Sequence, residues 1–125
     1  MLKEIKTKTQ HYFVDEQNRI QGEYRDYHEN GQLWEHSFRL NDIRHGEYKE
    51  YLENGRLWSC SFFQNGNLHG EYKCYHDNGI IDYATLFYQG NDLEVDPNTL
   101  TEQDKAYIML SGRLPPFFDT LTEKR

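Results

Sequence analysis

The chain has 125 residues and a formal net charge of −7, and its composition is 36% hydrophobic and 15% aromatic. An apolar content below the usual value of about 45–50% argues against a thick two-layer core. The many Tyr and Phe residues favour a thin fold in which large rings cover area. The negative charge argues against nucleic acids and membrane surfaces as partners, because both attract cationic proteins.

The N-terminal sequence MLKEIKTKTQHYF lacks the apolar core of a signal peptide. No stretch approaches the roughly 20 apolar residues of a membrane helix. Cys60 and Cys74 are the only cysteines, too few for a disulfide framework. We therefore expect a cytoplasmic protein without a transmembrane segment.

From Gly22 onward the sequence repeats every 24 residues. GEYRDYHENGQLW begins at Gly22, GEYKEYLENGRLW at Gly46 and GEYKCYHDNGIID at Gly70. A unit of this size cannot bury its apolar side alone and must stack on its neighbours. The sequence predicts a repeat domain over residues 1–95, with units near 22–45, 46–69 and 70–93 and a partial unit at 10–21. Residues 96–125 are expected to form a C-terminal helix and tail that pack on the end of the sheet.

Each unit carries two turn signals. The first is an Asn-Gly pair, which favours a two-residue type I′ hairpin because both central residues of that turn need a positive φ. The second falls at one fixed place in the unit but varies in composition. The first signals are Asn30-Gly31, Asn54-Gly55 and Asn78-Gly79, and the second are Asn41-Asp42, Asn65-Gly66 and Gln89-Gly90.

The segments between turns, such as Gln32–Leu40 and Ile43–Glu53, are rich in Tyr, Trp, Phe and Leu and contain no proline, as is typical of strands. We expect an all-β fold: a single-layer antiparallel meander of stacked β-hairpins, with about seven strands between Gln10 and Phe87. The glycine that opens each unit lies inside a strand, which indicates a bend, a bulge or room for an aromatic ring. A curved sheet would follow.

Two-residue loops would also set the register of the strands. Tyr27 would then face Trp34, and Tyr51 would face Trp58. A ladder of aromatic cross-strand pairs, each contributing about 0.2–1 kcal/mol, can support a sheet that lacks a second layer. One face would collect Tyr27, Trp34, Phe38, Tyr51, Trp58, Phe62, Tyr75 and Leu86, and the other Tyr24, Leu33, Tyr48, Leu57, Tyr72 and Ile81. Cys60 and Cys74 would fall on opposite faces, which disfavours a disulfide.

The shared pattern G-E-Y-x-x-Y-x-x-N-G-x-L-W resembles the MORN repeat, and in particular the bacterial and viral variant often labelled YwqK-family antitoxin. The resemblance covers about Tyr12 to Leu93. It implies an elongated single-layer sheet, often curved into a trough, that mediates protein–protein contact. Lipid binding has been proposed for some members, and the antitoxin label implies neutralisation of a partner protein.

The third unit departs from this pattern. Asp82 stands where Trp34 and Trp58 stand in the earlier units, and Glu94 replaces the glycine that would open a fourth unit. Terminal repeats are atypical because they must shield the last edge. The array is therefore expected to end near Glu94.

A helix is predicted over Glu102–Ser111. Thr101 can cap its start, and Gly112 can end it. Its expected apolar stripe is formed by Ala106, Met109 and Leu110, with Ile108 beside it. The helix would cover the open sheet edge, or dock on a partner. The adjacent Phe117 and Phe118 would fold back on the sheet or anchor into another chain.

No sequence motif indicates catalysis, metal binding or cofactor binding. The histidines recur because the unit recurs, and they offer no cluster of three or four ligands at a metal-binding spacing. There is no phosphate-binding glycine loop and no nucleophile elbow. We expect no metal, no cofactor, no catalytic residue and no enzymatic activity.

Three functional hypotheses remain. The first is a protein-binding module that uses an aromatic sheet face, with antitoxin-like neutralisation as one form of it; its expected contact residues are Tyr27, Trp34, Phe38, Tyr51, Trp58, Phe62 and Tyr75. The second is an acidic inhibitor that blocks a nucleic-acid-binding or defence protein by mimicking a polyanion, through Glu23, Asp26, Glu29, Glu47, Glu50, Glu53, Glu71 and Asp77. The third is a self-associating scaffold. The sequence leaves the partner's identity and the oligomeric state open.

Overall fold

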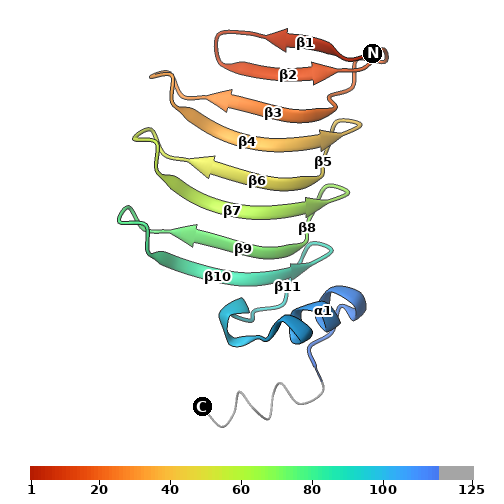
Figure 1. The fold of residues 1–125 in the computed structure, drawn as a ribbon, viewed down its shortest axis with the longest axis vertical. Coiled ribbons are helices and arrows are strands. Elements are labelled where there is room, and N and C mark those ends of the chain that lie inside the picture. The colour runs from red at the N-terminus through yellow and green to blue at the C-terminus, as the bar shows by residue number, and fades with distance from the viewer. Residues whose placement is uncertain (116–125) are drawn as a thin grey trace.

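The computed structural model describes residues 1–115, and over that range it forms one open antiparallel sheet followed by two short helices (Figure 1). Hairpins stack along the long axis of the molecule, and the strands are bowed. The strands are β1 (Lys3–Lys6), β2 (Gln10–Val14), β3 (Gly22–Tyr27), β4 (Leu33–Leu40), β5 (Ile43–Arg44), β6 (Gly46–Tyr51), β7 (Leu57–Gln64), β8 (Asn67–Leu68), β9 (Gly70–Tyr75), β10 (Ile81–Tyr88) and β11 (Asn91–Asp92). The predicted all-β single-layer meander is confirmed.

The main path of the sheet runs β1-β2-β3-β4-β6-β7-β9-β10-β11. Its strands from β2 to β10 match the seven expected between Gln10 and Phe87. The sequence prediction missed β1, which extends the sheet beyond the partial first unit. It also missed the short strands β5, β8 and β11, because the predicted segment Ile43–Glu53 is interrupted before Gly46.

The second turn of each unit is the two-residue hairpin that the sequence predicts. Leu40 pairs with Ile43 across Asn41-Asp42, and both turn residues have positive φ, 52° and 70°. Asn65-Gly66 and Gln89-Gly90 repeat this geometry. The type I′ conformation suits the twist of the flanking strands, so the less regular sequence signal still specifies the tighter turn.

The prediction for the first turn is wrong. Only Gly31 has a positive φ, 87°, so Asn30-Gly31 is not a type I′ pair. The N–H of Gly31 donates to the carbonyl of His28 at 2.9 Å, and His28 N–H donates to the carbonyl of Gln32 at 2.8 Å. These bonds close a three-residue loop. Asn30 is suited to this turn by its side chain, whose Oδ1 accepts from Gln32 N–H at 2.9 Å.

A bulge follows the turn and corrects the predicted register. Tyr27 pairs with Leu33, and Asp26 pairs with Glu35, which leaves Trp34 as the extra residue. Tyr51 likewise pairs with Leu57, and Tyr75 with Ile81. The predicted pairs Tyr27–Trp34 and Tyr51–Trp58 are therefore wrong, because the longer loop and the bulge shift the strand around the tryptophan.

The opening glycines provide both a bend and room for an aromatic ring. Gly46 and Gly70 each have a φ of +105°, a backbone conformation that L side chains rarely adopt. A Cβ at Gly46 would lie 3.7 Å from Cβ of Phe38, and one at Gly70 would lie 3.8 Å from Cβ of Phe62. The phenylalanine of each unit thus packs against the opening glycine of the next.

After the sheet, a 3-10 helix (Pro97–Thr99) leads into α1 (Glu102–Ser111), whose bounds match the prediction. Thr101 forms a capping box with Asp104, and Gly112 closes the helix with a φ of 73°. The helix lies against the end of the sheet (Figure 1). No helix among residues 1–115 is long and apolar enough to cross a membrane.

The predicted apolar stripe of α1 needs correction. Ile108 is completely buried, whereas Leu110 is 85% exposed and Ala106 is exposed as well. Ile108 joins Leu86, Val95 and Leu100 in the main apolar cluster of the described chain, with Met109 at its margin. Phe117 and Phe118 lie outside the described residues, so their predicted packing stays untested, as does the domain boundary at residue 95.

Candidate protein-binding face

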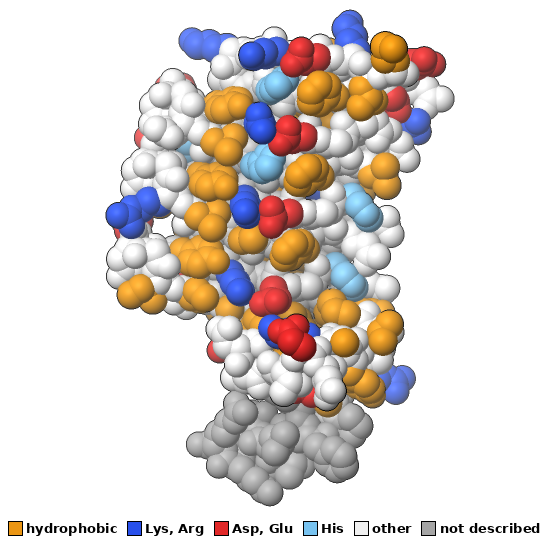
Figure 2. Space-filling view, viewed as in Figure 1, with side chains coloured by type: hydrophobic (Ala, Val, Ile, Leu, Met, Phe, Trp, Pro, Cys, Tyr) orange, Lys and Arg blue, Asp and Glu red, His pale blue; other side chains and the backbone are white. Residues whose placement is uncertain are grey.

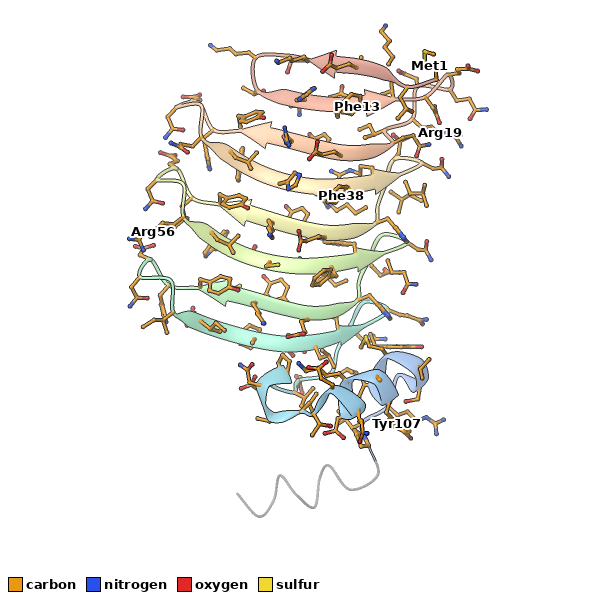
Figure 3. All side chains as sticks on the ribbon, viewed as in Figure 1. Met1, Phe13, Arg19, Phe38, Arg56 and Tyr107 are labelled. Atoms are coloured by element: carbon orange, nitrogen blue, oxygen red, sulfur yellow. The ribbon has the colours of Figure 1, made fainter. Side chains whose placement is uncertain are left out.

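One face of the sheet carries three parallel rows of side chains, and we call it the front face. It is the face turned towards the viewer in Figure 2, and Phe13 and Phe38 mark it in Figure 3. Cross-strand pairs align the same residue types in each unit, since Glu23 pairs with Phe38 and Glu47 with Phe62. The first row is Phe13, Glu23, Phe38, Glu47, Phe62, Glu71 and Leu86; the second is His11, Arg25, His36, Lys49, Cys60, Lys73 and Ala84; the third is Tyr27, Leu33, Tyr51, Leu57, Tyr75 and Ile81.

Charges on the front face are matched within each unit. Arg25 lies 3.0 Å from Glu23, Lys49 lies 3.5 Å from Glu47, and Lys73 lies 3.4 Å from Glu71. Figure 2 shows the resulting basic and acidic columns side by side, with hydrophobic columns flanking them. The front face is therefore amphipathic and close to neutral.

The first row is open along the array and closed at one end. Phe62 is 40% exposed, but Leu86 in the same row is only 1% exposed because the α1 cluster covers it. Lys105 of α1 also reaches Glu71, with Nζ 3.6 Å from Oε2. The row is thus available to another molecule over the first two units, while the protein's own helix occupies the end of the third.

The two tryptophans lie on the opposite, rear face. Trp34 follows Leu33, which pairs with Tyr27 on the front, so strand alternation turns Trp34 to the rear. Its ring stacks on His28 with centroids 5.1 Å apart. Trp34 and Trp58 are 45% and 46% exposed. The predicted contact set is therefore divided: its tyrosines and phenylalanines share the front face, and its tryptophans do not.

Most of the rear face is packed rather than open. Ser37 and Ser61 are each 1% exposed, and the Arg39 guanidinium lies 4.6 Å from the centroid of the Tyr24 ring. Burial, reinforced by the carboxylates of Glu35 and Glu50, raises the pKa of Tyr48. Among the predicted other-face residues, Tyr24, Tyr48 and Tyr72 do lie here. Leu33, Leu57 and Ile81 belong to the front, again because of the bulge.

The eight acidic residues proposed as a polyanion surface are dispersed. Glu23, Glu47 and Glu71 lie on the front face and each has a basic neighbour. Asp26 and Glu50 lie on the rear face, where they pair with Glu35 in adjacent strands. Glu29, Glu53 and Asp77 occupy the first turns of the three units.

A groove lies where the first turn of unit one meets its neighbours, and sequence reasoning did not identify it. Its volume is about 700 Å³. Trp34 and His28 supply aromatic surface, and Glu29 and Glu53 approach from two successive turns. The sequence feature that could have predicted the groove is the short connection between β1 and β2. Because this connection is short, Thr9 lies beside the turn and lines the groove.

The residue before each opening glycine forms a hydrogen bond with the second turn of the following unit. This contact gives a structural role to two of the recurring histidines. The side chain of the residue accepts a hydrogen bond from the first backbone N–H of the second turn, 20 residues further on. The pairs are Gln21 with Asn41 at 3.0 Å, His45 with Asn65 at 3.4 Å and His69 with Gln89 at 3.0 Å. These contacts stabilise the stacking of units, and they involve only one histidine each.

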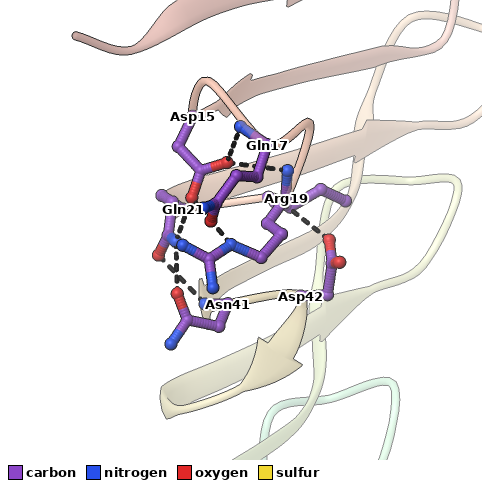
Figure 4. A network of polar contacts seen from close by, with 7 residues as sticks. Asp15, Gln17, Arg19, Gln21, Asn41 and Asp42 are labelled. Carbon is purple, nitrogen blue, oxygen red and sulfur yellow. Dashed lines mark hydrogen bonds and ion pairs between the residues drawn. The ribbon is translucent and has the colours of Figure 1, made fainter.

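At the first such junction the contact grows into a network (Figure 4). Gln21 donates to Asp15 at 2.9 Å and to the side chain of Asn41 at 2.6 Å, and the Arg19 side chain donates to Asp15 at 2.9 Å. The backbone N–H of Arg19 and the amide of Gln21 hold the pKa of Asp15 well below its usual range. The network has structural partners for each of these groups, so we assign it a structural role.

Cys60 and Cys74 are free thiols, and they lie on opposite faces as predicted. Burial raises the pKa of Cys60, which keeps its thiol protonated and unreactive at neutral pH. In residues 1–115 there is no group of three His, Cys, Asp or Glu side chains arranged to hold a metal ion.

A pH dependence of stability is expected from Glu23. The hydrogen bond from His36, with Nε2 2.7 Å from Oε2, and the charge of Arg25 lower the pKa of Glu23. A carboxylate whose pKa is lower in the folded state stabilises the fold above its unfolded pKa of about 4.3, and that contribution disappears as the pH falls through the folded value.

We therefore expect a Glu23→Gln variant to lose less stability than the wild type between about pH 5 and pH 2. Urea unfolding at a series of pH values measures this. Glu16→Gln, at an exposed turn, is the matched control and should follow the wild-type slope. Parallel curves for wild type and Glu23→Gln would contradict the prediction.

The fold and the open front face together define a hairpin-repeat protein whose sheet presents a periodic surface. A family model described as a MORN repeat variant matches residues 20–41, 44–67 and 68–89, which together make up more than half of the chain. The chain belongs to the MORN repeat variant family. MORN repeats generally serve as protein- or membrane-interaction modules and are typically non-catalytic. No curated protein and no solved structure matches the chain.

Proposed function

We propose that this protein is a non-enzymatic binding module that engages a partner protein through its front face. The observation that carries the proposal is the alignment of Tyr27, Tyr51 and Tyr75 in one row and of Phe38 and Phe62 in another, with matched charges between them. The contact set is the sequence-predicted one without Trp34 and Trp58, which lie on the rear face.

The physical basis is the combination of aromatic area and paired charge. Tyrosine and arginine are enriched among residues that dominate binding energies, and their contribution is largest where water is excluded around them. On the front face Arg25 stands in the row between the tyrosines and the phenylalanines, and its partner Glu23 alternates with the phenylalanines. A partner with its own apolar centre and opposed charges would bury the rings and satisfy both charges.

The alternatives receive less support. Polyanion mimicry requires acids gathered on one surface, but these acids are divided among two faces and the turns, and three have basic neighbours. Self-association could use β1, which pairs only with β2 and leaves one edge free in the described sheet. Its two lysines are a common protection of such edges. Antitoxin-like neutralisation is one form that the proposed binding could take.

Two variants test the proposal. Tyr51→Ala with Phe62→Ala removes front-face rings, and Trp58→Ala removes a rear-face ring that lies outside the groove at Trp34 and is about as exposed as Phe62. We expect a partner captured from the source cells by the wild-type protein to be lost with the first variant and retained with the second, while circular dichroism shows both folded. Loss with the rear variant alone would contradict the proposal.

A further inference from the structure

We propose that the groove at Trp34 is a receptor site for an arginine side chain presented by another molecule. The groove shares only Tyr27 with the front-face contact residues, and its proposed ligand is bound by other side chains, so it does not depend on the function proposed above. It adds a specific ligand chemistry, a guanidinium cation, at one end of the array.

The shape of the groove provides the first argument. Its volume of about 700 Å³ is ample for one long side chain and the backbone that carries it. It exists at unit one because the β1–β2 connection has four residues between the paired Lys6 and His11, whereas the first turns have five, as between Tyr27 and Leu33. The wall that a preceding turn would form is missing here.

The aromatic surface provides the second argument. Trp34 is 45% exposed, and its ring is held in place by stacking on His28. His28 is itself fixed, because Nε2 lies 2.8 Å from the carbonyl oxygen of Tyr51 in the next unit. A rigid, half-exposed indole is the best aromatic partner for a cation, and a guanidinium stacks on it more often than an ammonium does.

Charge provides the third argument. Asp26, Glu29 and Glu53 all line the groove, and no lysine or arginine lines it. Within residues 1–115 none of these three acids takes part in an ion pair, in contrast to Glu23, Glu47 and Glu71 of the front face. Lys8 and Glu29 both line an adjoining depression, but among residues 1–115 Lys8 forms no ion pair with any of these acids. The groove is thus the place where unpaired negative charge and an exposed indole coincide.

One unit further on, the protein places a guanidinium of its own at the equivalent turn. Arg56 of unit two donates from Nη1 to the backbone carbonyl of Asp77, the turn residue of unit three. The corresponding residue of unit one is Gln32, which is neutral. At the edge between the first two units, therefore, no internal guanidinium occupies the place beside Glu53, the counterpart of Asp77.

The test uses tryptophan fluorescence of the full chain. Trp58→Phe leaves Trp34 as the only reporter in the groove, and Trp34→Phe leaves Trp58 as a matched reporter outside it. The probe is N-acetyl-arginine amide, with the citrulline analogue as a neutral molecule of nearly the same shape. We expect a saturable change in emission for Trp58→Phe with the arginine probe, and none with citrulline or with Trp34→Phe.

The acidic lining is tested by adding Glu29→Gln and Glu53→Gln to the Trp58→Phe protein. Two exposed charge interactions predict a loss of affinity of about three- to tenfold, and a similar weakening when salt is raised towards 1 M. The salt titration needs no variant at the acids, so it remains informative if the glutamine variant does not fold.

Several results would overturn the proposal. These are equal responses from the two reporters, equal binding of citrulline, affinity unaffected by salt and by the acid variants, or equal binding of N-acetyl-lysine amide. The front-face variants do not touch the groove. If those variants lose partner capture while Trp34 fluorescence shows no binding of the arginine probe, this site is rejected and the proposed function still stands.

Discussion

Replacing Ile108 with alanine is expected to lower the free energy of unfolding by about 2–5 kcal/mol, the range for removing a large aliphatic side chain from a packed core. Ile108 is 0% exposed and lies in the cluster with Leu86, Val95 and Leu100. A sheet of one layer has few such sites, so each contributes a large share of total stability. Urea unfolding monitored by circular dichroism measures the change.

The same helix offers a matched control. Leu110 is two residues away and 85% exposed, so Leu110→Ala should change stability by no more than about 0.5 kcal/mol. Equal effects of the two substitutions, whether large or small, would show that α1 does not pack on the sheet as described.

Replacing Gly112 with alanine is expected to cost about 1–3 kcal/mol. Gly112 ends α1 with a φ of 73°, which strains any residue with a Cβ. The added Cβ would also stand 2.7 Å from Cε1 of Tyr88, closer than packed atoms approach. Either the helix end or the Tyr88 ring must move, and the helix would lose its fit to the sheet.

Gly79→Ala separates the two causes. Gly79 has a φ of 86°, but no atom lies within 4 Å of the position that an added methyl group would take, so this variant carries the backbone strain without the collision. Thermal unfolding of both proteins should show a clearly lower midpoint for Gly112→Ala. Equal midpoints would assign the whole cost to backbone strain and contradict the predicted collision with Tyr88.

The sequence predicted what depends on local rules. The 24-residue period, the second turns and the bounds of α1 all follow from signals that act over a few residues, such as the capping pair Thr101 and Asp104. The stacked single-layer sheet follows from the repeat itself, because identical units must bury equivalent surfaces against one another.

The site was predicted less completely, for two physical reasons. The Asn-Gly signal at Asn30-Gly31 is compatible with more than one turn, and a single bulge residue was enough to place Trp34 on the other face. The groove depends on the relative lengths of two loops, at residues 7–9 and after Tyr27, which belong to different units. Neither feature can be read from one unit taken alone.

Because every unit adds two long strands, the length of the front-face surface increases in equal steps along the array. Each unit advances the front-face rows by two strand spacings, or about 10 Å, and direct cross-strand pairing keeps each row on one face. A copy of residues 46–69 inserted after residue 69 should lengthen the binding surface by one such step without altering its pattern. Proteins with different numbers of units would then bind partners whose contact lengths differ in steps of about 10 Å.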